Sequence, residues 1–125
     1  MTKHFLFSLV FILLSFSLSY AQEKPVMKNY FMVFLKKGPV RNQDSVEVEK
    51  LQMGHLYNIT KLHTEGKLIL AGPFLDDGDF RGIFVFDVPT LEEVKKLVET
   101  DPAISSGRLS YEVHPWMTQQ GACLK

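Results

Sequence analysis

Apolar runs separated by Gly, Pro and acidic turns divide the chain into six regular segments. Two segments repeat apolar residues at steps of three and four, which predicts amphipathic helices from Asp44 to about Glu65 and from Thr90 to Asp101. Four shorter runs rich in aromatic and β-branched residues predict strands, at residues 30–35, 68–71, 82–88 and 109–113.

Both predicted helices carry start signals. Asp44 with Glu47, and Thr90 with Glu93, have the spacing of a capping box, in which each end of the motif satisfies a free backbone N–H. Gly66 suits the left-handed position that ends many helices. The boundaries of the two helices therefore rest on local chemistry as well as on periodicity.

The resulting order is β-α-β-β-α-β. With right-handed crossovers this order predicts a ferredoxin-like α+β sandwich, a four-stranded antiparallel sheet with two helices on one face. The second face of such a sheet normally meets solvent and alternates apolar with polar residues.

The first strand does not alternate in this way. Tyr30, Met32 and Phe34 point to one face and Phe31, Val33 and Leu35 to the other, so that both faces are apolar. A large apolar face needs a cover, and a second copy of the same sheet is the simplest one. We therefore expect a homodimer with sheet faces packed together.

The first 21 residues have the pattern of a secretory signal peptide. Lys3 gives a positive start, Phe5 to Leu18 is an apolar run, and Ser19-Tyr20-Ala21 supplies the small residues of a cleavage site. The run is short for a membrane span, which needs about 20 apolar residues. We expect an exported protein, periplasmic or secreted, with no stable membrane span after cleavage and a mature domain at residues 22–125. An uncleaved anchor is the alternative.

Charge and cysteine content exclude some classes of function. The chain has 14 basic and 14 acidic residues, and removing the signal segment with Lys3 leaves a formal charge of −1. No basic block is present, so we expect no nucleic-acid partner. Cys123 is the only cysteine, which rules out an internal disulfide, and packing must stabilise the domain. Cys123 is a reactive thiol, a link between chains or an incidental residue of the tail.

His55 interrupts the apolar stripe of the first helix. The stripe runs Val48, Leu51, His55, Ile59, Leu62, and these positions share one helical face. A buried ring nitrogen without a partner costs about 1–3 kcal/mol, so His55 needs a polar neighbour. It is either a satisfied core histidine or part of a site.

A metal site finds little support. His63 lies eight residues from His55 and off its face, so the helix has no metal pair. Asp76, Asp77 and Asp79 form an acidic turn with too few ligands for a calcium loop. We expect no metal and no cofactor.

The chain resembles the YciI-like (YCII-related) proteins from about residue 29 to 116. The resemblance is carried by the order and spacing of short elements: His55-Leu56, Leu62, Gly66-Lys67-Leu68, Ala71-Gly72-Pro73, Gly82, Asp101-Pro102 and Gly107. It implies a ferredoxin-like dimer with a His–Asp pair proposed as the active site, here His55 and Asp101. Most members lack an assigned reaction, and one branch acts on chlorinated muconolactones.

A His–Asp pair can transfer protons, because the carboxylate fixes the imidazole tautomer and leaves the second nitrogen to act as base or acid. The first hypothesis is a cofactor-free small-molecule enzyme of lyase, isomerase or hydrolase type, with Gly72, Pro73 and Phe74 beside the substrate. The second is a non-catalytic dimeric module that binds a small ligand. Asp101 before Pro102 also fits a simple helix N-cap.

Overall fold

The structure is a computed structural model, and it describes residues 23–124. The predicted signal peptide, residues 1–21, lies outside the described residues. No helix in the described part of the chain is long and apolar enough to cross a membrane.

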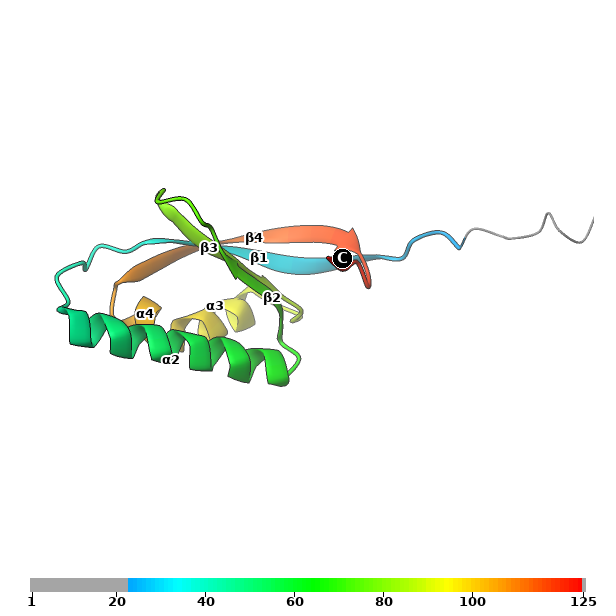
Figure 1. The fold of residues 1–125 in the computed structure, drawn as a ribbon. Helices are drawn as coiled ribbons and strands as arrows, with labels where there is room; N and C mark the ends of the chain where they lie inside the picture. The colour runs from blue at the N-terminus through cyan, green and yellow to red at the C-terminus, as the bar shows by residue number, and fades with distance from the viewer. Residues whose placement is uncertain (1–22, 125) are drawn as a thin grey trace, which may run out of the picture.

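Four antiparallel strands form one sheet in the order β2-β3-β1-β4, and the helices lie on one side of it (Figure 1). This arrangement confirms the predicted ferredoxin-like α+β fold. The elements in chain order are β1 (Met27–Lys37), α2 (Ser45–Thr64), β2 (Leu68–Pro73), β3 (Phe80–Phe86), α3 (Leu91–Glu99), α4 (Pro102–Ser105) and β4 (Leu109–Gln119).

The core fills the space between the sheet and the helices. Central side chains from β1 and β3 pack there against apolar residues of α2 and α3, so the inward half of the strand pattern is buried as the sequence predicts. The buried cluster consists of Val33, Leu35, Leu62, Leu68, Phe84, Phe86, Val94 and Val98.

The predicted caps are present. Oδ1 of Asp44 accepts a hydrogen bond of 2.8 Å from the N–H of Glu47, and Oγ1 of Thr90 accepts one of 3.2 Å from Glu93. Gly66 has a φ of 71°, the left-handed conformation that favours glycine after a helix.

The ends of the other predicted elements agree with the structure to within about three residues, but two segments differ more. The last strand, expected to end at residue 113, continues to Gln119, because β4 pairs with β1 along its whole length up to Met27. Pro115 is tolerated within it since β4 is an edge strand. The segment after Asp101, expected as a turn, is the short helix α4.

A β-bulge near the start of β3 changes the direction of one side chain. Leu35 pairs with Gly82 and Lys36 with Phe80, so Arg81 is an extra residue without a partner on β1. A bulge of this kind re-aims the inserted side chain. Strict alternation would send Arg81 to the outer face with Ile83, but it lines a cavity on the helical side.

Within residues 23–124, no helix covers the outer face of the sheet (Figure 1). Met32, Ile83 and Trp116 lie there, and residues 120–124 fold back near them to border a hollow of about 680 Å³. The tail covers only part of this face, so the apolar character predicted from β1 is present in the folded chain.

Candidate active site

The structure brings His55 and Asp101 into contact. Nδ1 of His55 lies 2.5 Å from Oδ2 of Asp101, although 46 residues separate them in the chain. Close packing of α2 on α4 makes this possible: a Cβ on Gly54 would lie 2.6 Å from Cγ of Pro102. The glycine before His55 and the proline after Asp101 thus set the approach of the two elements.

Asp101 uses each carboxylate oxygen for a different hydrogen bond. Oδ1 accepts from the N–H of Ala103 at 2.9 Å and caps α4, while Oδ2 faces His55. The side chain is fully buried, with an exposed fraction of 0%. A buried carboxylate requires such partners, since an unpaired charge in the interior is very costly. The capping role and the contact with His55 therefore coexist.

The hydrogen bond to Asp101 determines what His55 can offer a ligand. A carboxylate only accepts, so Nδ1 donates and Nε2 of the neutral ring keeps its lone pair. Nε2 has no hydrogen-bond partner among the described residues. Every buried side-chain nitrogen or oxygen in that part of the chain does have a partner, so Nε2 is not a buried atom. It is therefore accessible from outside the protein. The ring also stacks on Phe84, with centroids 5.8 Å apart and planes 25° apart.

His55 borders a cavity of about 460 Å³ between α2 and the sheet. Of the predicted ligand contacts, Gly72 and Pro73 line it, whereas Phe74 is not in its wall and is 40% exposed. Phe74 follows the last residue of β2, where the chain leaves the sheet. The described residues that line it are Leu35, Arg41, Gln52, His55, Leu56, Ile59, Ala71, Gly72, Pro73, Arg81, Gly82, Phe84, Arg108 and Leu109.

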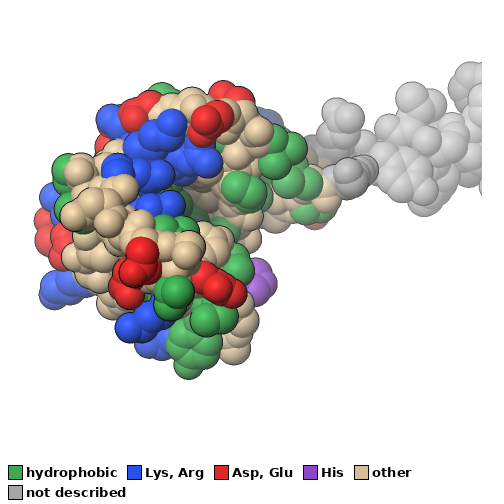
Figure 2. Space-filling model, turned by 60° about the vertical axis from the view of Figure 1, so that its left-hand side comes forward, with side chains coloured by type: hydrophobic (Ala, Val, Ile, Leu, Met, Phe, Trp, Pro, Cys, Tyr) green, Lys and Arg blue, Asp and Glu red, His purple; other side chains and the backbone are tan. Residues whose placement is uncertain are grey.

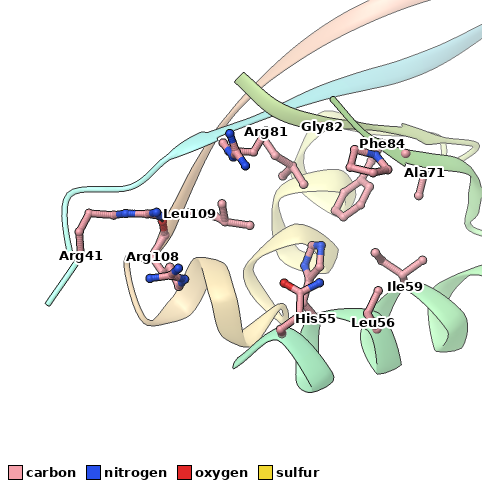
Figure 3. A pocket seen from close by; sticks show the side chains of 14 residues that line it. Arg41, His55, Leu56, Ile59, Ala71, Arg81, Gly82, Phe84, Arg108 and Leu109 are labelled. Atoms are coloured by element: carbon pink, nitrogen blue, oxygen red, sulfur yellow. The ribbon is translucent and has the colours of Figure 1, made fainter. Parts of the chain in front are cut away.

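Three arginines in this wall are not predicted from the sequence. Arg41 comes from the loop before α2, Arg81 from the bulge of β3 and Arg108 from the turn before β4. Figure 2 shows Lys and Arg side chains gathered around a hollow, and Figure 3 shows these three arginines across the cavity from the apolar residues of α2 and β2. Single arginines in separate loops give no periodic signal, and alternation along β3 places Arg81 on the wrong face.

Other sequence candidates lie elsewhere. Nδ1 of His63 is 2.9 Å from the backbone oxygen of Leu68, and His114 is exposed at the outer face beside Phe34. Cys123 is a free, exposed cysteine. Within residues 23–124, no group of three or more His, Cys, Asp or Glu side chains could hold a metal ion.

Two side chains with shifted titration lie outside the cavity. A hydrogen bond to Asp87 raises the pKa of Lys28, with Nζ 2.6 Å from the carboxylate. Burial, and then a hydrogen bond to Glu99, raise the pKa of Tyr111. Neither group contacts the His55–Asp101 pair.

The chain is a small α+β domain with a ferredoxin-like fold. It has a candidate proton-transfer site, because a His–Asp pair lies beside a small cavity. The model of the YCII-related domain matches residues 30–117, most of the chain. The chain therefore belongs to the YCII-related family. No curated protein matches it closely.

A solved structure similar to this chain is 5-chloro-2-hydroxyhydroquinone dehydrochlorinase from Burkholderia phenoliruptrix AC1100, in complex with 2,5-dihydroxybenzoquinone. The two sequences are 25% identical, and the TM-score is 0.53. The alignment covers 70% of this chain and 92% of the dehydrochlorinase. The similarity thus extends over nearly the whole of an enzyme that binds a small organic molecule.

Proposed function

We propose that this protein is a cofactor-free enzyme of lyase type that acts on a small molecule, with His55 as the proton-transfer group and Asp101 as its positioning residue. One observation carries the proposal: Nδ1 of His55 is held 2.5 Å from a buried carboxylate, and the ring borders a cavity of ligand size. Such an arrangement presents Nε2 as a base to whatever occupies the cavity.

The proposed step is a proton abstraction. Nε2 takes a proton from a substrate C–H or O–H, and the electron pair left behind forms a double bond while a leaving group departs with its own pair. Asp101 stabilises the imidazolium that forms without itself taking the proton. Elimination is favoured over isomerisation or hydrolysis because the similar solved structure is that of a dehydrochlorinase.

Substitution of His55 tests this function. We expect His55→Gln to lower turnover by about 10²–10⁴-fold, the usual contribution of a general acid or base. The assay is a screen of halogenated hydroxyhydroquinones, lactones, esters and enols with the purified mature domain. His63→Gln is the matched control, because His63 lies on the same helix and outside the cavity.

The alternative is a non-catalytic module that binds a small ligand in the same cavity. It would be supported if the protein bound members of the screen with no turnover of any of them. Equal turnover by native protein and His55→Gln would show that the proton-transfer group lies elsewhere.

We also propose that the functional unit is a homodimer formed through the outer face of the sheet. Its support is the apolar character of that face in the folded chain. Met32 and Ile83 border the hollow under the tail, and no helix of the described chain covers the strands there.

We further propose that the protein is exported, as the pattern of residues 1–21 predicts. N-terminal sequencing of the protein recovered from the extracytoplasmic fraction should find Gln22 as its first residue. Recovery of the chain in the cytosol with residues 1–21 attached would contradict export.

A further inference from the structure

Three guanidinium groups line the cavity, and the described residues of its wall include no carboxylate. Asp101 contacts His55 from outside this lining, and its two oxygens already face His55 and Ala103. A cavity with this lining has a positive potential and attracts anions.

Arg41 and Arg108 are placed side by side by two tightly packed loops. The backbone oxygen of Arg108 accepts hydrogen bonds from the N–H of Gly38 at 2.9 Å and from Nη1 of Arg41 at 3.0 Å. The contact leaves no room for a side chain at Gly38, since a Cβ there would lie 2.1 Å from the oxygen of Gly107. The fold therefore joins the two arginines at one end of the cavity.

These two guanidinium groups are not neutralised within the described part of the chain. Nη1 of Arg108 donates to the amide oxygen of Gln43 at 3.2 Å, and neither Arg41 nor Arg108 has a described carboxylate within 4.0 Å. Each keeps further N–H donors that a ligand can use, since a guanidinium carries five. A guanidinium also fits a carboxylate through two parallel hydrogen bonds.

Arg81 differs from the other two arginines because it supports the turn before β3. Its Nη1 lies 3.3 Å from Oδ1 of Asp77 and 3.3 Å from the backbone oxygen of Gly78. Asp77 is 95% exposed, and a pair of this kind contributes only about 0–1 kcal/mol and neutralises the arginine weakly. Arg81 adds positive charge to the cavity but also has a structural role.

The opposite part of the wall is apolar. Ile59, Ala71 and Phe84 lie there, and the His55 ring stands between them and the arginines (Figure 3). Phe84 stacks on the His55 ring and is itself only 2% exposed, so the ring is held against the apolar part of the wall. A ligand with a planar unsaturated body and an anionic group at one end matches both parts of the wall.

We infer that the substrate is a small planar organic acid, bound as its carboxylate by Arg41 and Arg108 with its unsaturated body against the apolar part of the wall beside His55. The inference rests on the proposed function in taking this cavity as the substrate site. It adds the charge and shape of the substrate, and it assigns Arg41 and Arg108 as residues that determine specificity.

Equilibrium binding tests this inference without requiring turnover. The probes are two acids and their uncharged methyl esters: benzoate with methyl benzoate, and sorbate with methyl sorbate. Titrations followed by ¹H–¹⁵N NMR should show at least tenfold tighter binding of each acid than of its ester, with shifts at Gly72, Gly82 and His55. The double variant Arg41→Gln/Arg108→Gln should lose this preference and leave ester binding unchanged.

Two further variants separate the possible causes of failure. Lys95→Gln removes an exposed charge from α3, which contributes nothing to the cavity wall, and should keep the acid preference. His55→Gln should keep it as well, even where it abolishes turnover, so a failure of the proposed function would leave the acid preference intact. The inference is overturned if the esters bind as tightly as the acids, if neither acid shifts the cavity resonances, or if the double variant binds the acids like the native protein.

Discussion

At the scale of single residues, Asp101 shares its carboxylate between the ring of His55 and the backbone N–H of Ala103. Asp101→Asn should keep the cap, since an amide oxygen also accepts. Its NH₂ would then donate to Nδ1 of His55 and move the ring proton to Nε2, which could no longer act as a base. We expect turnover to fall by about 10²–10⁴-fold. Stability should fall by about 1 kcal/mol, because a neutral hydrogen bond replaces a charge-assisted one. Enzyme assays, ¹⁵N NMR of the ring and thermal unfolding measure these effects.

Asp44→Asn is the matched control for this substitution. Asp44 caps α2 through its Oδ1 at 2.8 Å from the N–H of Glu47, but it is exposed and has no histidine partner among residues 23–124. The same chemical change there should leave turnover and the His55 tautomer unaltered. An Asp101→Asn protein that kept both full turnover and the Nδ1–H tautomer would contradict the role given to Asp101.

The sequence predicts the residues of the site unevenly. His55 is recognisable because a polar ring interrupts an apolar stripe, a local signal that periodicity exposes. Only the family resemblance suggests Asp101 as its partner, because an Asp before a Pro is equally typical of the N-cap of a helix. The arginines carry no sequence signal, because their meeting depends on contacts between loops far apart in the chain.

At the scale of elements, the approach of β2 to β3 depends on one glycine. A Cβ on Gly82 would lie 2.6 Å from the backbone oxygen of Gly72, whereas a Cβ on Gly72 would meet nothing within 4 Å. Gly82→Ala should therefore force the strands apart and destabilise the fold by about 1–3 kcal/mol, the usual cost of overpacking. Gly72→Ala, on the facing strand, should leave stability nearly unchanged.

Chemical denaturation of the two alanine variants gives the comparison directly. Equal midpoints for Gly82→Ala and Gly72→Ala would show that β2 can shift without cost. The β-bulge at Arg81 belongs to the same scale, because it follows from pairing with β1 and not from the residues of β3 themselves. Element types and caps are thus predictable from local sequence, while bulges and strand lengths depend on the partner strand.

At the scale of the whole molecule, the predicted order of elements is sufficient to give the fold, because right-handed crossovers leave few ways to arrange βαββαβ. The sheet order β2-β3-β1-β4 places β1 between two other strands. The helices cover one face of β1, and its other face lies on the outer side of the sheet. The inward apolar residues of β1 belong to the core, and the outward ones are the reason for proposing association.

Association through the outer face gives the last prediction. Ile83 lies in the central strand β3, borders the hollow on that face and is only partly buried in the single chain. Ile83→Lys would place a charge in the middle of a dimer contact, whose apolar core excludes unpaired charges. Sedimentation velocity of the mature domain at micromolar concentration should show a dimer for the native protein and a monomer for Ile83→Lys. Val46→Lys, at a position 74% exposed on α2, should remain a dimer. A native protein that sediments as a monomer would contradict the proposed dimer.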